Sequence, residues 1–201
     1  SRFVIEALVA GKNVFVEKPL ALTPEELNEI IDVYDRCGQI PASSSTITVG
    51  FNRRFSPHSR AVKKAIGDNP GPVNIVATMN AGFIPQNVWI HDLQTGGGRI
   101  IGEACHYFDL SVYLTGSEIE SVCMNAMGDS PRENTDNASI LLRFRNGSNA
   151  VINYFANGAK SYGKERIELY SRERVFVIDN FRSTKAFGAR GFRNIRTKAD
   201  K

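Results

Sequence analysis

The chain has 201 residues, of which 42% are hydrophobic and 23% charged, and a formal net charge of +4. This composition is ordinary for a globular protein. No run approaches the roughly 18 apolar residues of a membrane span, and residues 1–10 lack the pattern of a secretory signal, so we expect no membrane association. The three cysteines are an odd number without a Cys-x-x-Cys pair. They favour a cytoplasmic protein over a disulfide framework or a zinc site.

The positive charge is concentrated near the C-terminal end, where Asp200 is the only acid. Such a tail can bind nucleic acid, but a solvated terminus is the simpler interpretation. The sequence shows no zinc knuckle, RNP-like aromatic motif or helix-turn-helix pattern, so we predict no nucleic-acid partner. The basic residues concerned are Arg182, Lys185, Arg190, Arg193, Arg196, Lys198 and Lys201.

Residues 1–50 alternate between helix and strand patterns. The first apolar-periodic helix is predicted over residues 2–10, and β-branched strands over residues 13–17 and 47–51. Strands separated by helices indicate parallel crossovers and a doubly wound sheet. Because such a sheet needs more than two strands, we interpret residues 1–50 as the C-terminal remnant of a Rossmann-type dinucleotide-binding domain, within a fragment of a longer protein.

The helix between these two strands carries explicit end signals. Thr23 is a plausible N-cap, Pro24 occupies the first helical position, and Glu26 completes a capping box. Gly38 is expected to stop the helix.

The pattern changes after Gly50. A helix over residues 57–66 leads into a series of strand-like runs, interrupted by one helix at about 102–114. Short turns between strands, such as Asn146-Gly147, are typical of antiparallel pairs. We therefore predict a mixed α/β (α+β) fold in which residues 51–201 form an open, mostly antiparallel sheet with helices on one face. The predicted strands are 73–79, 119–127, 138–144, 150–155, 166–170 and 175–178.

The first group of residues with chemical potential is Glu17-Lys18-Pro19. It follows a strand, and ligands bind at the carboxyl ends of strands in parallel sheets. The lysine could neutralise a phosphate or polarise a substrate oxygen. Taken alone it could equally be a surface lysine.

The second group begins with three glycines at 96–98 and continues onto a helix with Glu103, His106 and Asp109. Residues three apart share a helix face. A histidine between two carboxylates can act as a general base whose pKa its neighbours tune. A core or capping histidine is the alternative.

The third group is Gly50 to Pro57, where Asn52 and Arg53 follow the second strand. Its arginines could clamp a phosphate or a carboxylate, or lie solvated in a loop. Trp89, the only tryptophan, precedes the glycines and could stack on a sugar ring or plug the edge of the core.

Together these three groups resemble the glucose–fructose oxidoreductase, inositol dehydrogenase and rhizopine-catabolism (Gfo/Idh/MocA) family of oxidoreductases. The resemblance lies in Ala7 to Ala21, around Glu-Lys-Pro, in Gly50 to Pro57, and in Gly96 to Leu110. It spans nearly the whole chain, with the three blocks in the family's order and spacing.

The resemblance implies an oxidoreductase that transfers hydride between NAD or NADP and a hydroxyl or carbonyl of a sugar, sugar nucleotide or cyclitol. Lys18 matches the lysine that contacts cofactor and substrate, and His106 matches the catalytic histidine, with Glu103 as the nearby carboxylate. Members commonly form dimers or tetramers through the open sheet. The implied cofactor-binding residues are Glu17, Lys18, Pro19 and Arg53, and the implied substrate-binding residues are Asn52, Arg53, Trp89, Arg99, Glu103 and His106, with no metal ligand.

Two departures from the family pattern leave a second interpretation open. Many members carry an aspartate four residues before the histidine, where this chain has Gly102, and Glu103 points about 100° away around the helix. No Gly-x-Gly-x-x-Gly is present, so the main cofactor-binding half is absent from this chain. The alternative is a non-catalytic carbohydrate-binding or oligomerisation module of the same fold.

Overall fold

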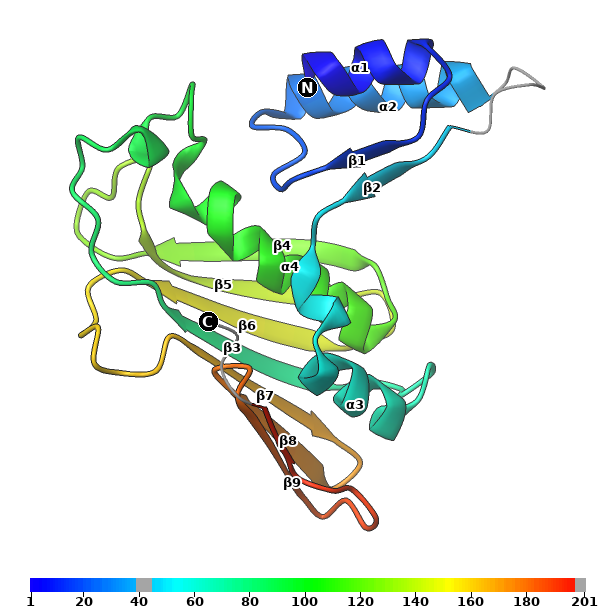
Figure 1. The fold of residues 1–201 in the computed structure, drawn as a ribbon. Coiled ribbons are helices and arrows are strands. Elements are labelled where there is room, and N and C mark those ends of the chain that lie inside the picture. The colour runs from blue at the N-terminus through cyan, green and yellow to red at the C-terminus, as the bar shows by residue number, and fades with distance from the viewer. Residues whose placement is uncertain (39–44, 198–201) are drawn as a thin grey trace.

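The computed structural model describes residues 1–38 and 45–197. Near the N-terminus, helices α1 (Arg2–Val9) and α2 (Pro24–Gly38) cover the parallel strands β1 (Val14–Val16) and β2 (Ile47–Val49). Figure 1 shows this small layer above a larger sheet. Its core is the apolar stripe of the two helices, with Val4, Leu8, Ile30 and Val33 buried.

The start of α2 is capped as its sequence predicts. The backbone N–H of Glu26 donates to the Thr23 hydroxyl at 3.3 Å. The Glu26 carboxylate accepts from the N–H of Leu22 at 2.8 Å rather than from the N–H of Thr23. The reciprocal arrangement of a capping box is therefore present with its return bond one residue earlier.

The larger sheet has eight strands in the order β10-β9-β8-β7-β3-β6-β5-β4. Strand β3 pairs parallel with β6, and the other pairings in this sheet, within the described residues, are antiparallel. The mostly antiparallel sheet predicted from the sequence is thereby confirmed. The strands are β3 (Asn74–Asn80), β4 (Ile119–Ala126), β5 (Asn137–Phe144), β6 (Asn149–Phe155), β7 (Glu165–Ser171), β8 (Arg174–Asp179), β9 (Ser183–Phe187) and β10 (Ile195–Arg196).

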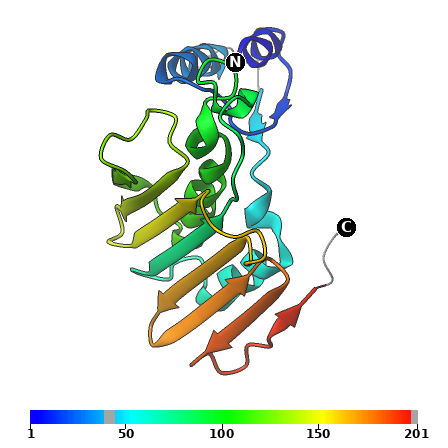
Figure 2. The same ribbon diagram turned by 90° about the vertical axis from the view of Figure 1, so that its left-hand side faces the viewer.

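Helices α3 (Pro57–Ile66) and α4 (Cys105–Thr115) lie on the same face of this sheet (Figures 1 and 2). Alternate strand residues point into the core beneath them, as in β7, where Ile167 and Leu169 are each 1% exposed. Leu110 and Leu114 of α4 close that core from above. The apolar alternation along the strands thus determines which face of the sheet the helices cover.

Two details differ from the sequence-based expectation. Strands β9 and β10 lie in the basic segment where no strand was predicted. The helix expected at 102–114 consists of a π-helical turn, Ile100–Ala104, followed by α4. Among the described residues, no helix combines the length and apolar character needed to cross a membrane.

Candidate functional site

Residues 17–19 lie at the carboxyl end of β1, beside the segment that follows β2. The N–H of Gly50 donates to the carbonyl of Val16 at 2.8 Å. A carbon added at Gly50 would lie 3.0 Å from a carboxylate oxygen of Glu17. The first and third sequence motifs therefore meet at one end of the parallel pair, where ligands bind in sheets of this kind.

The side chain of Lys18 connects this small sheet to α4. Its Nζ donates a hydrogen bond to the carbonyl oxygen of Gly102, in the π-helical turn, at 2.7 Å. The Lys18–Pro19 peptide bond is cis. An ammonium group has three donors, so Lys18 keeps two for a ligand.

His106 lies in the first turn of α4 and is 7% exposed. Its ring meets that of Phe51 edge to face, with centroids 6.1 Å apart. In the described part of the chain, Nδ1 is buried and has no hydrogen-bond partner. Burial, followed by the charges of Arg53, Lys18 and Lys164, lowers the pKa of His106 to about 4. The imidazole is therefore neutral at physiological pH and able to accept a proton.

The carboxylate of Glu103 contacts two neighbouring side chains, those of Tyr154 and Arg99. The Tyr154 hydroxyl donates to its carboxylate at 2.7 Å, and a guanidinium nitrogen of Arg99 lies 3.7 Å away. Burial first, and then the bond to Glu103, raise the pKa of Tyr154, so the phenol stays protonated and remains the donor.

The carboxylate of Asp109 likewise binds a side chain other than His106, that of Arg54. Its carboxylate accepts from Nε of Arg54 at 2.9 Å and forms an ion pair with the same guanidinium. The sequence suggested that Glu103 and Asp109 flank His106 and tune its pKa. The structure corrects this interpretation, because neither acid bonds to the imidazole and the neighbours that shift its pKa are cations.

Arg53 is fixed at the rim of the His106 site. Its Nη2 lies 2.5 Å from an oxygen of Glu165, at the start of β7, and its Nη1 donates to the side-chain oxygen of Asn52 at 3.0 Å. The guanidinium also stacks over the ring of Phe181, 5.5 Å from the centroid. These contacts hold one positive charge in a defined place close to the histidine.

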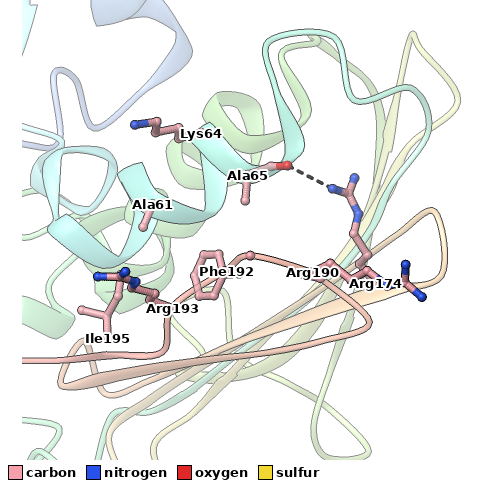
Figure 3. A pocket seen from close by; sticks show the side chains of 10 residues that line it. Ala61, Lys64, Ala65, Arg174, Arg190, Phe192, Arg193 and Ile195 are labelled. Atoms are coloured by element: carbon pink, nitrogen blue, oxygen red, sulfur yellow. Dashed lines mark hydrogen bonds between the residues drawn. The ribbon is translucent and has the colours of Figure 1, made fainter.

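A cavity of about 580 Å³ lies elsewhere, between α3 and the connection from β9 to β10. Figure 3 shows Phe192 at its floor and the cationic side chains spread around it. At one end of the cavity, the guanidinium of Arg174 donates a hydrogen bond to the carbonyl oxygen of Ala65 at 3.0 Å, in the last turn of α3. None of the residues predicted as site residues lines this cavity.

Two family models match the chain on either side of residues 44–60. Residues 61–177 match the Gfo/Idh/MocA C-terminal domain, and residues 1–43 match an oxidoreductase family with an NAD-binding Rossmann fold. The chain belongs to the Gfo/Idh/MocA family of oxidoreductases.

The chain is similar to a curated enzyme and, in its fold, to two solved structures. Inositol 2-dehydrogenase of Rhizobium meliloti is 30% identical over 181 residues, covering 86% of this chain and 52% of the relative. An oxidoreductase domain protein from Kribbella flavida superposes with a TM-score of 0.79 at 25% identity, covering 97% of this chain and 59% of the other. The WlbA dehydrogenase of Bordetella pertussis, solved with NADH and UDP-GlcNAcA, superposes with a TM-score of 0.72 at 23% identity, covering 90% and 53%.

This Gfo/Idh/MocA chain spans about half the length of the curated relatives it matches. Its predicted site residues fall into two sets. Glu17, Lys18, Pro19, Asn52, Arg53, Glu103 and His106 gather around the carboxyl end of β1 and the start of α4. The second set consists of Trp89 and of Arg99, which contacts Glu103 from the buried side.

Arg99 lies underneath the site and Trp89 is directed to solvent. Arg99 is 1% exposed, and its guanidinium donates to the carbonyls of Gly82 and Ala81 at 2.8 and 3.2 Å. It therefore supports Glu103 from within and has no surface to offer a substrate. Trp89 is 65% exposed.

Sequence reasoning missed Tyr154, Lys164 and Glu165. Glu165 shares the inward side of β7 with Ile167 and Leu169. A carboxylate on an apolar strand face needs a buried partner, and this was the available signal. For Tyr154 and Lys164 no local pattern distinguishes them from other strand and loop residues.

Proposed function

We propose that the complete protein is an NAD(P)-dependent dehydrogenase acting on a hydroxyl group of a sugar, sugar nucleotide or cyclitol. The observation that carries this is a nearly buried, neutral His106 just after the π-helical turn whose Gly102 carbonyl accepts a hydrogen bond from the ammonium of Lys18. The dehydrogenase names of relatives in the same family, among them the inositol enzyme, support the substrate class.

In this proposal His106 takes the proton of the substrate hydroxyl, and Lys18 donates a hydrogen bond to the oxygen as it becomes negative. A bound nicotinamide cofactor would supply the acceptor for the hydride of the carbinol carbon. In the reverse direction, protonated His106 returns the proton to the carbonyl oxygen. The lowered pKa of His106 keeps its ring unprotonated at neutral pH, at the expense of its strength as a base.

The residues present fit such a cofactor in part. Glu17, Lys18 and Pro19 follow one strand of the parallel pair, at the end where cofactors bind, and Arg53 follows the other strand at that same end. The glycine-rich turn that holds a pyrophosphate is not in this sequence. We therefore assign these residues to the nicotinamide end of NAD or NADP.

The direct test is to incubate the complete protein with polyols or sugars and NAD⁺ or NADP⁺. Oxidation is monitored through the absorbance of the reduced cofactor. Turnover that requires His106 supports the proposal. Binding of a cofactor and a sugar without any turnover would instead support a non-catalytic module. The observation in favour of that second function is Gly102, which stands where many family members carry an aspartate.

We further propose that residues 1–50 and 51–201 belong to two domains, and that the open face of the larger sheet pairs with a second copy in a dimer or tetramer. The apolar residues Leu141, Tyr170 and Phe187 on that face are 51%, 38% and 58% exposed. Size-exclusion chromatography with light scattering tests the assembly. A cytoplasmic location remains our expectation, supported by the three free cysteines.

A further inference from the structure

The orientation of the His106 imidazole is not fixed by a hydrogen bond at Nδ1. A histidine that moves protons is usually oriented by such a bond, often to a carboxylate. Here Nδ1 is buried and has no partner in the part of the chain that the structure describes. Glu103 and Asp109, three residues away on either side, bond to other side chains, and Gly102, four residues earlier, has no side chain. The orientation of the ring therefore depends on a contact of another kind.

The ring of Phe51 supplies such a contact. It meets the imidazole of His106 edge to face, with the centroids 6.1 Å apart and the ring planes at 80°. Aromatic pairs favour this arrangement, and it restrains the plane of the smaller ring. Phe51 follows β2 closely, and its backbone N–H donates to the carbonyl oxygen of Val49 at 2.7 Å. The chain then enters the single 3-10 turn Asn52–Phe55.

The segment that begins with Phe51 lies along α4. Arg54, three residues after Phe51, donates from Nε to the carboxylate of Asp109 at 2.9 Å. Residues three apart stand on one side of a 3-10 turn, and residues three apart share a face of an α-helix. The contacts Phe51–His106 and Arg54–Asp109 therefore follow one another along α4, and the second limits movement of the first.

Arg53 attaches the same segment to the larger sheet. Its Nη2 lies 2.5 Å from an oxygen of Glu165, whose side chain is 8% exposed at the start of β7. Its guanidinium also lies over the ring of Phe181, between β8 and β9. A charge-assisted hydrogen bond to a buried carboxylate is stronger than a neutral one. The segment is thus fixed on two sides, by α4 and by the strand ends.

We propose that Phe51 orients the imidazole of His106 for proton transfer. Glu165 and Asp109 are positioning residues in this arrangement, because each carboxylate binds an arginine of the segment that carries Phe51. The inference rests on the dehydrogenase proposed above and deepens it by naming the groups that orient its proton acceptor. A displacement of about 1 Å at a reacting group can cost about a hundredfold in rate, so such groups affect turnover without touching the substrate.

Substitution of Phe51 tests the ring contact in the complete protein. Phe51→Leu should lower kcat by about tenfold to a hundredfold and change KM little, because it removes no group that binds substrate. Phe51→Tyr keeps the ring and should retain most of kcat. Phe55→Leu, at a phenylalanine 67% exposed in the same turn, is the matched control. Wild-type kcat in Phe51→Leu, or an equal loss in Phe51→Tyr, would overturn the proposal.

A double-mutant cycle tests whether Glu165 acts through Phe51. Glu165→Gln should lower kcat by about tenfold in the wild-type background and far less in Phe51→Leu, where no ring contact is left to hold. Substrate binding by Arg53 alone would instead change KM. If thermal unfolding shows that Glu165→Gln does not fold, Asp109→Asn takes its place in the cycle. Additive losses of kcat would overturn the positioning role.

Chemical modification of His106 separates this inference from the proposed function, because it requires no turnover. Diethyl pyrocarbonate reacts with the unprotonated imidazole, and mass spectrometry of peptides from the complete protein locates the product. Phe51→Leu should raise the modification rate of His106 severalfold relative to His58 and His91, each 1% exposed, and Phe55→Leu should not. Faster modification without oxidation of any sugar would support the positioning role and count against the dehydrogenase. An unchanged modification rate in Phe51→Leu would overturn the positioning role whatever the turnover.

Discussion

The Nζ of Lys18 lies 2.7 Å from the carbonyl oxygen of Gly102, although the two residues are 84 positions apart in the chain. This bond ties the end of β1 to the turn that carries His106 four residues later. It brings an ammonium that follows a strand of the two-stranded sheet close to a histidine on a helix that covers the eight-stranded sheet. The distance between proton acceptor and electrostatic stabiliser in the proposed reaction therefore depends on this contact.

Replacing Lys18 by Met should lower kcat by about a hundredfold or more, since loss of one donor to a developing oxyanion costs about that much. The side chain is partly exposed and bonded to one carbonyl, so the unfolding midpoint should change little. Steady-state rates and thermal unfolding of the complete protein check both points. Lys12→Met, at an exposed lysine, provides the matched control, and wild-type rates in Lys18→Met would refute the role.

Replacing His106 by Ala should lower kcat by about 10² to 10⁴-fold, the usual range for a general base. In the wild type, kcat/KM for oxidation should fall only as pH approaches about 4, because burial and nearby cations lower the pKa of the free imidazole to that value. A pH profile of initial rates measures this limb. An acidic limb near the ordinary histidine value of 6.5 would contradict the lowered pKa.

The same shift has a consequence for stability. Because the folded pKa of His106 lies below its unfolded value, its contribution to the free energy of unfolding is fully present above pH 6.5. It is lost as pH falls from 6.5 toward about 4, where the unfolded chain binds the proton first. Urea unfolding of wild type and His106→Gln at pH 7 and pH 5 should show the larger acid loss in the wild type. Equal losses in both proteins would exclude His106 as the cause.

Elements with local signals could be predicted from the sequence. Thr23 caps α2 through the N–H of Glu26. Gly147 adopts a φ of +83° between β5 and β6, as an Asn-Gly turn requires. Strand β9 was missed because its five residues, Ser183–Phe187, contain one lysine and mostly small or polar side chains and so lack the run of apolar residues that marks the central strands.

The site could be predicted only as far as its motifs reach. Lys18 and His106 stand in recognisable segments, and the structure brings them together. The pairs Tyr154–Glu103 and Arg53–Glu165 depend instead on register, because β6 and β7 flank β3 with Met79 opposite both Tyr154 and Glu165. Pairing between strands far apart in the chain is set by the assembled core, and one sequence alone does not specify it.

Substitutions at Glu103 test whether this residue only holds the turn before His106 or takes part in the reaction. Glu103→Gln keeps an oxygen that can accept from Tyr154, so activity should stay within about tenfold of wild type if Glu103 only holds the turn. Tyr154→Phe leaves a partly buried carboxylate with one partner fewer and should cost about 1–3 kcal/mol of unfolding free energy. Denaturant unfolding and steady-state rates distinguish the two, with Tyr162→Phe, at a tyrosine 65% exposed, as the control. A loss of activity in Glu103→Gln as large as in His106→Ala would make Glu103 a catalytic residue.

Gly96 should not tolerate a side chain, because the chain folds tightly against itself before the site. A carbon added there would lie 2.7 Å from both the carbonyl oxygen of Trp89 and the Cα of Ile90, and these are backbone atoms that cannot rotate away. Gly96→Ala should therefore lower the free energy of unfolding by about 1–3 kcal/mol, the usual cost of overpacking. It should also reduce activity, since the same turn leads into the segment that bears Gly102 and His106. Gly163→Ala, where the nearest atom is 3.8 Å away, should stay within about 0.5 kcal/mol of wild type. Equal stability of the two variants in urea would show that the Trp89 turn can move aside.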